Sequence, residues 1–258
     1  MDSNWVFAGV DCSAGARQLT VAALSPRLDV KFLRALKVEE AAEELSRFSG
    51  IAVAIAAPLC PHPAASPADS PPGKARRGAA AGGRRPETDI RRRGITLRPS
   101  PADEETASAA LRAVFHLVRL LAERGFAEGL TARESPRFLL ETRPAACAAV
   151  LLGRLPFGRA TLEGRIQRQL LLIRERVGLP DPMDRLEEMT AHHLLSGRLA
   201  LGGILQPEEL DALLAAFTAW RATSQPATVT WLGGDSDGSI CLPAKELMEK
   251  YIKSEYLK

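Results

Sequence analysis

The sequence predicts an α/β fold in which a mixed β-sheet is flanked by helices, and three observations support this prediction. First, apolar segments of strand length occur at 5–11, 51–59 and 137–142, as expected for strands buried on both faces of a sheet. Second, segments with apolar residues at intervals of three and four, typical of helices, separate them. Third, the chain has 258 residues, of which 46% are hydrophobic. This is enough for the single domain that we expect over 1–258.

The first part of the chain predicts three strands, a helix and a fourth strand. Strands are expected at 5–11, 19–24 and 30–36, and the short turn between the second and the third predicts antiparallel neighbours. A helix is expected over 38–48. The fourth strand, 51–59, follows this helix and is therefore expected to run parallel to the first strand in the centre of the sheet.

A segment rich in proline, alanine, glycine and arginine interrupts this pattern over about 61–83. It has too few apolar residues to bury, so we expect a disordered, mobile insertion. A short helix is expected over 84–94. The next helix is expected to start between Ser100 and Asp103, because this stretch supplies a cap, a proline and an acid in the order that helix starts favour.

The second half predicts one more strand, several helices and a terminal hairpin. The strand is expected at 137–142, and Pro144 starts a short helix. Longer helices are expected over 162–177 and 206–222 from their apolar spacing. A glycine- and aspartate-rich turn within 229–242 predicts a hairpin.

The helical region after residue 160 also predicts which side chains face outward. We expect three arginines on the outer face of the first helix: Arg165, Arg168 and Arg176. A further helix is expected to be capped at Asp181. From this region we expect three apolar side chains to face inward: Leu186, Met189 and Leu194.

Composition excludes several classes of protein. No apolar run approaches the ~20 residues that a membrane helix needs, and no basic cluster precedes an apolar run near Met1, so we expect a cytoplasmic protein without membrane contact. The four cysteines are far apart and are expected to be buried and reduced. Neither Cys60 nor Cys147 has an evident histidine partner, and no Gly-x-Ser-x-Gly motif occurs. A serine or cysteine hydrolase is therefore not favoured.

Positive charge is concentrated in one stretch of the chain. The net charge is +3, but Lys74 to Arg98 holds nine basic and two acidic residues. Such a segment can attract phosphate groups, or it can be a solvated loop. The arginines expected to contact nucleic acid are Arg84, Arg85, Arg91, Arg92 and Arg93.

Three carboxylates are candidates for a functional site. Asp11 and Glu141 end two predicted central strands, and Asp211 lies on the last long helix beside small residues. Asp11 could instead cap the turn that follows it, and Asp211 could be a solvated surface acid. If the three converge, their oxygens suit hard divalent cations, and such ions promote phosphodiester hydrolysis. The predicted order of strands and helices also suits a ribonuclease H-like layout.

Six short motifs occur in order along nearly the whole chain: Gly9 to Gly15, Ala56 to Leu59, Arg85 to Gly94, Glu141 to Ala146, Asp211 to Leu213 with Ala216 to Ala219, and Gly238 to Pro243. Together they resemble the DUF429 family, whose members are predicted nucleases with a ribonuclease H-like fold. The resemblance implies that Asp11, Glu141 and Asp211 are the catalytic and metal-binding residues. It also implies Mg²⁺ or Mn²⁺ as the cofactor and nucleic acid as the partner.

The chain departs from the family at Ala56, where members usually carry an aspartate. Alanine cannot bind a metal ion, so the resemblance implies a metal-dependent nuclease or phosphodiesterase that is weakened or inactive. Glu87 or Asp89 could instead supply an acid from the predicted helix at 84–94.

Two other functions stay open. The loss of the acid at Ala56 favours a non-catalytic relative that binds nucleic acid. Asp11 followed by Ser13 and Gly15 also resembles the first phosphate-binding turn of actin-like ATPases and sugar kinases. No second glycine-rich phosphate turn is evident, so this phosphotransferase is the less favoured alternative. The sequence does not indicate an oligomeric state.

Overall fold

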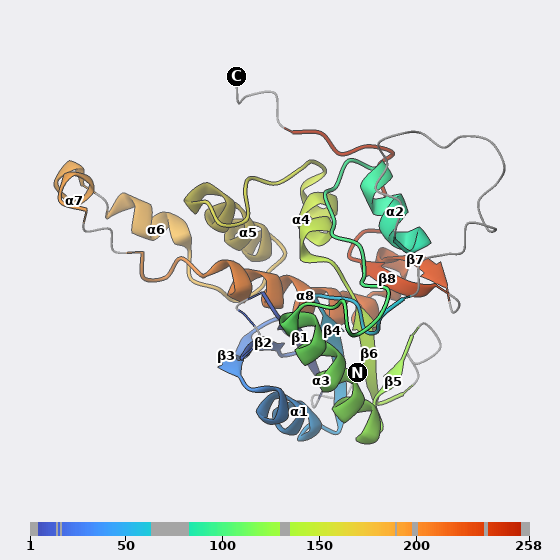
Figure 1. The fold of residues 1–258 in the computed structure, drawn as a ribbon. Helices are drawn as coiled ribbons and strands as arrows, with labels where there is room; N and C mark the ends of the chain where they lie inside the picture. Colours follow the sequence, from blue (N-terminus) through green and yellow to red (C-terminus); the bar gives the residue numbers. More distant parts are fainter. Residues whose placement is uncertain are drawn as a thin grey trace.

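The computed structural model describes residues 5–13, 15, 17–62, 83–129, 135–188, 190–197, 201–234 and 237–253. The predicted insertion at about 61–83 lies almost entirely outside these residues. Within them, the predicted α/β class is confirmed, because eight strands form one mixed sheet with helices on both faces (Figure 1).

The strands of the first part of the chain lie where the sequence predicts them. The first three are β1 (Trp5–Asp11), β2 (Leu19–Leu24) and β3 (Val30–Leu36), which pair as antiparallel neighbours. The fourth, β4 (Gly50–Ile55), runs parallel to β1. It ends four residues earlier than the sequence suggests.

The remaining strands extend the sheet on the other side of β4. They are β5 (Ala127–Glu128), β6 (Arg137–Glu141), β7 (Thr230–Gly234) and β8 (Gly238–Leu242). β6 is parallel to β4 and to β8, and β7 and β8 form the predicted hairpin, so the strand order is β3-β2-β1-β4-β6-β8-β7. β5 pairs with β6 and was not predicted, since two residues are too few to give a pattern.

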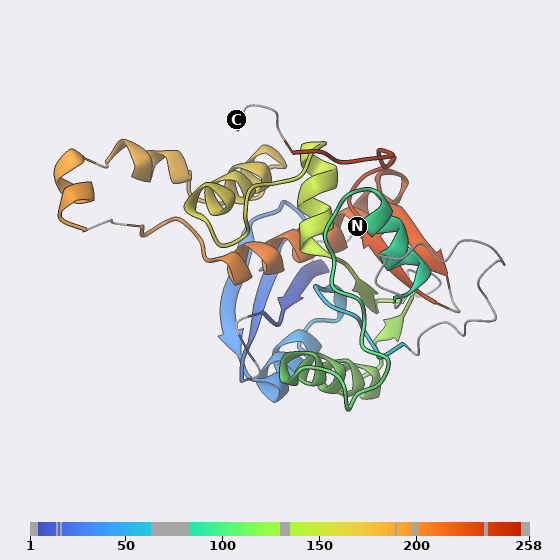
Figure 2. The same ribbon diagram turned by 45° about the horizontal axis from the view of Figure 1, so that its top comes forward.

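Two groups of helices cover the two faces of the sheet. One face packs against α1 (Val38–Ser46) and α3 (Ala109–Glu123). The other packs against α4 (Pro144–Leu152), α5 (Leu162–Arg174) and α8 (Pro207–Ser224). Figures 1 and 2 show α8 lying across the central strands, and α2 (Arg85–Arg92) beside the β7–β8 hairpin.

The long helix α8 touches β1 with its backbone, because both elements offer small residues at the contact. A methyl group added at Gly9 would overlap the backbone of Ala212 and Ala216 on α8. The side chains of Ala212, Ala215 and Ala216 are fully buried there. This close approach places Asp211, the residue before Ala212, over the sheet face that carries Gly9.

The helix predicted to begin near Ser100 begins later. Ser108 is the actual N-cap, and its hydroxyl accepts a hydrogen bond from the Leu111 backbone N–H. Asp103 instead accepts a hydrogen bond from the Thr106 N–H, which closes a separate turn. Both stretches carry cap residues, and the apolar stripe that decides between them starts only after Ser108.

Two of the three arginines expected on the outer face of α5 are buried. Arg165 donates hydrogen bonds to the carbonyls of Ile204 and Leu205. Arg168 donates to the carbonyls of Phe157 and Gly164. The prediction was wrong because an arginine can be buried when backbone carbonyls accept hydrogen bonds from its guanidinium, even though Arg168 Nε has no such partner among the described residues.

Two short helices, α6 (Pro182–Glu187) and α7 (Ala191–Leu195), project away from the sheet (Figure 2). Asp181 caps α6 as predicted. Leu194 was expected to face inward but is 59% exposed, and none of the described residues of α7 is buried. Met189, predicted in the same set, lies outside the described residues. Among the described residues, no helix combines the length and the apolar character needed to cross a membrane.

Candidate functional site

Asp11 and Asp211 lie in one cleft at the carboxyl end of β1. The cleft has a volume of about 600 Å³, and Ala56, Arg143 and Arg159 also line it. Both carboxylates are buried, with Asp11 4% and Asp211 7% exposed. The structure therefore brings together two of the three acids that the sequence selected.

A single arginine lies between the two acids. Arg159 Nε is 2.5 Å from Asp211 Oδ2, and Arg159 Nη2 is 3.8 Å from Asp11 Oδ2. The same guanidinium donates a hydrogen bond to Ser13 Oγ. The Ser13 backbone N–H donates to Asp11 Oδ2 at 2.8 Å, so Asp11 also forms the turn cap that its sequence context suggested.

The electrostatics of the pair reflect two buried negative charges facing one cation. Burial and the nearby charge of Asp211 raise the pKa of Asp11 to about 6, although hydrogen bonds from Ser13 and the charge of Arg159 oppose the shift. Burial also raises the pKa of Asp211, against the opposing effect of Arg159. One arginine does not fully compensate the two carboxylates, and a further cation would relieve their repulsion.

The loop before α5 carries Arg159 and is held in place at both sides. Thr161 caps α5 by accepting a hydrogen bond from the Gly164 N–H. The buried Arg168 donates to the carbonyl of Phe157 at 3.1 Å. The backbone at Arg159 is therefore fixed, while its side chain remains 38% exposed at the mouth of the cleft.

Glu141 points away from Asp11 because of the strand register. Val10, Ile55 and Glu141 form one row across β1, β4 and β6, and neighbours in a row share a face of the sheet. Asp11 lies one residue further along β1, beside Ala56, and successive residues face opposite sides. Within the described part of the chain, no three histidine, cysteine, aspartate or glutamate side chains gather as a ready metal site.

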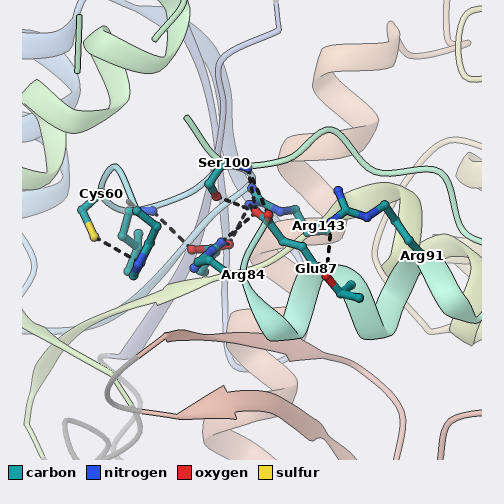
Figure 3. Close-up of polar contacts among 10 residues, drawn as sticks. Cys60, Arg84, Glu87, Arg91, Ser100 and Arg143 are labelled. Carbon is teal, nitrogen blue, oxygen red and sulfur yellow. Dashed lines mark hydrogen bonds and ion pairs between the residues drawn. The ribbon is translucent and has the colours of Figure 1, made fainter. Parts of the chain in front are cut away.

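Glu141 belongs instead to a buried network of two glutamates and two arginines (Figure 3). It pairs with Arg84 and, at 2.8 Å, with Arg143. Glu87 pairs with the same two arginines at 3.2 and 2.9 Å, and it accepts hydrogen bonds from the backbone and the hydroxyl of Ser100. Arg143 therefore links this network to the cleft, which it also lines.

Glu87 and Asp89, the two acids considered as replacements at the site, are placed very differently. Glu87 is fully buried in the network. Its hydrogen bonds from Ser100 and the charges of the arginines hold its pKa below the usual range, although burial alone would raise it. Asp89 is 47% exposed and pairs with Arg92 at 3.6 Å. Neither residue lines the cleft with Asp11.

The five arginines expected to contact nucleic acid divide into separate environments. Arg84 is buried against Glu141, so it does not present an exposed charge. Arg93 donates to the carbonyls of Leu247 and Met248, and Arg91 donates to Thr88. The exposed positions are Arg85 and Arg92, whose side chains are 84% and 77% exposed.

Cys60 departs from two expectations. It is exposed, unlike the buried Cys147 and Cys241, and its sulfur lies 3.5 Å from His62 Nε2. Both residues line a smaller cavity of about 230 Å³ beside Glu141. Burial raises the pKa of the Cys60 thiol, so the thiolate needed for nucleophilic catalysis is disfavoured.

Arg159, the arginine that lies between Asp11 and Asp211, was not identified from the sequence. Its signal is absent from the local pattern, because its partners are 52 and more residues distant along the chain. Arg143 entered the sequence analysis only as part of the motif Glu141 to Ala146, and the structure shows that it lines the cleft.

One of three comparisons with known proteins gives a match, and it identifies a family. The family model described as "Protein of unknown function (DUF429)" matches residues 9–235. No curated protein and no solved structure matches the chain. The matched segment includes most of the sheet, both cleft acids and the buried network, so the chain belongs to the DUF429 family.

Proposed function

We propose that the cleft with Asp11 and Asp211 hydrolyses phosphodiester bonds in nucleic acid with the help of a divalent cation, and that Ala56 weakens this activity. The observation that carries the proposal is the buried pair of carboxylates with one shared counter-ion. The strand order supports it, because β3-β2-β1-β4-β6 is the order expected for a ribonuclease H-like layout.

The side chains of the cleft suit a hard divalent cation. Carboxylate oxygens are the ligands that Mg²⁺ and Mn²⁺ prefer, and Asp11 and Asp211 offer them in one buried space. When bound there, such an ion would supply Lewis-acid stabilisation of a phosphodiester. In the present structure Arg159 occupies the position between the two acids that a cation would take. Its side chain is partly exposed and would have to turn outward for the ion to bind.

Arg143 is suited to bind the phosphate of a substrate. Arg143 lines the cleft, and its ion pairs with Glu87 and Glu141 fix the guanidinium in one orientation. A fixed guanidinium binds a phosphate with little loss of conformational entropy. Arg98 lines the same cleft and adds positive charge near its entrance. We therefore assign substrate positioning to Arg143 and the cation to the acid pair.

A cleavage assay tests the proposal. We expect slow hydrolysis of labelled single-stranded, duplex or hybrid oligonucleotides in Mn²⁺, and loss of cleavage to background in Asp11→Asn and in Asp211→Asn. Glu163→Gln is the matched control, because this acid is exposed on α5 away from the cleft. Cleavage that persists in both cleft variants would identify a contaminating enzyme and overturn the proposal.

A second candidate function is the binding of nucleic acid without cleavage, which Ala56 specifically favours. Under this alternative, exposed Arg85 and Arg92 on α2 contact the phosphate backbone. We expect the double variant Arg85→Gln/Arg92→Gln to bind a labelled oligonucleotide several-fold more weakly and with a shallower salt dependence. Fluorescence anisotropy at several salt concentrations measures both. Unchanged affinity would exclude α2 from the interface.

A further inference from the structure

A separate cavity of about 460 Å³ lies toward the far end of α8. It is bounded by the turn between β2 and β3, the end of α5 and the C-terminal part of α8. Its lining includes four arginines and one tryptophan: Arg27, Arg174, Arg176, Arg221 and Trp220. Trp220 follows Asp211 by nine residues, which is ~13 Å along a helix. The cavity is thus distinct from the acidic cleft.

The charges that line this cavity are strongly unbalanced. Glu175 is the single acidic residue in its lining, and it pairs with Arg174 at 3.5 Å and with Arg221 at 3.8 Å. The exposed side chains of Arg27 and Arg176 have no hydrogen bond or ion pair within the part of the chain that the structure describes. Two guanidinium groups are therefore available to an anion.

The two loops that carry these arginines are held in an unusual backbone conformation. Leu28 and Arg176 have φ angles of 67° and 69°, and no other described residue except glycine has a positive φ. Helix ends favour glycine at the position of Arg176, so an arginine there adds strain. The Gly178 N–H donates to the Leu28 carbonyl at 3.0 Å and latches the two loops together.

Trp220 gives the cavity an aromatic wall. The ring stacks on Phe217 with centroids 5.7 Å apart, and its Nε1–H donates to the Pro26 carbonyl at 3.1 Å. These contacts fix the indole, which remains partly exposed and lines the cavity. A fixed aromatic surface beside free arginines is suited to a flat base joined to a phosphate.

We propose that this cavity binds a nucleoside phosphate, with the phosphate on Arg27 and Arg176 and the base against Trp220. The volume is within the range of cavities that hold small ligands. The ligand can be a free mononucleotide or the phosphorylated end of an oligonucleotide, since both present the same groups. This inference does not rest on the proposed function of the acidic cleft.

Titration calorimetry with the full chain tests the proposal, using AMP, adenosine, inorganic phosphate and a 5′-phosphorylated oligonucleotide. We expect AMP to bind at least tenfold more tightly than adenosine or phosphate alone. If the 5′-phosphorylated oligonucleotide binds and its unphosphorylated form does not, the cavity also accepts the phosphorylated end of an oligonucleotide. AMP binding no tighter than adenosine would overturn the role of the arginines, and AMP no tighter than phosphate would overturn that of Trp220.

Arg176→Gly separates ligand binding from folding. Glycine suits the positive φ at this position, so the variant is expected to keep or raise the melting temperature while its affinity for AMP falls about tenfold. Arg27→Gln is expected to weaken binding similarly. Arg47→Gln is the control, because Arg47 is 62% exposed at the end of α1 on the other face of the sheet. Unchanged affinity in Arg176→Gly and Arg27→Gln would overturn the proposal.

Discussion

Replacing Glu87 by alanine is expected to destabilise the fold by about 3–5 kcal/mol, because it leaves two buried guanidinium groups with half of their partners. Glu87 is fully buried and receives hydrogen bonds from Ser100, Arg84 and Arg143. Without it, Glu141 alone would face both arginines. Chemical denaturation monitored by circular dichroism measures the loss of unfolding free energy.

Asp89→Ala is the matched control for this variant, since Asp89 lies two residues later on the same helix and is exposed. We expect it to change the unfolding free energy by less than ~0.5 kcal/mol. Equal destabilisation by the two variants would show that α2 itself, and not the buried network, is responsible.

The stability difference between the wild type and a third variant, Glu87→Gln, is expected to depend on pH, because the pKa of Glu87 is lowered in the folded protein. A carboxylate with a folded-state pKa below its unfolded value stabilises the fold above the unfolded pKa, and this contribution is lost as the pH falls through the folded pKa. The difference in unfolding free energy between the wild type and Glu87→Gln is therefore expected to be largest above the ordinary pKa of a glutamate and to shrink as the pH falls below it. Denaturation curves at pH 7 and pH 3.5 measure this change.

The sheet could be predicted from the sequence because its information is local. Uniformly apolar stretches such as Ile51–Ile55 identify central strands, and the short turn before Val30 identifies an antiparallel pair. The position of the N-terminus of α3 could not be decided in the same way. Ser100 and Ser108 are both good caps, and only the packing of α3 on the sheet shows which one begins the helix.

The candidate site could be predicted only in part, because side-chain direction depends on register. Asp11 and Glu141 both end apolar strands, and this pattern is the same whether they share a face or not. A shift of one residue between β1 and β6 places them on opposite faces. The partner of each acid was equally hidden. Arg159 reaches Asp211 from 52 residues away, and Arg84 reaches Glu141 from 57, distances over which no sequence spacing indicates contact.

Ala56→Asp is expected to restore a third carboxylate to the acidic cleft and to raise Mn²⁺-dependent cleavage by about 10²-fold, which is the lower end of the loss caused by removing one group that stabilises a transition state electrostatically. The register supports this expectation. Ala56 follows Ile55, its N–H donates to the Val10 carbonyl at 2.8 Å, and it lies beside Asp11 on the same face. Ala56 is also half-buried and lines the cleft, so a larger side chain has room.

The melting temperature of Ala56→Asp, measured with and without Mn²⁺, distinguishes a cleft that binds a cation from one that merely gathers acidic residues. In a chelator, the added charge repels Asp11 and Asp211, so the melting temperature should fall below that of the wild type. Saturating Mn²⁺ should reverse the loss, because an ion that binds only the folded state stabilises it in proportion to its occupancy. Ala56→Asn has the same size without the charge, so it should show no electrostatic loss in the chelator and only the smaller rise with Mn²⁺ that Asp11 and Asp211 alone provide. If Mn²⁺ raises the melting temperatures of Ala56→Asn and Ala56→Asp equally, the carboxylate added at position 56 does not bind the ion. If Mn²⁺ raises neither, the cleft is not a cation site, and the acid pair serves only to hold Arg159.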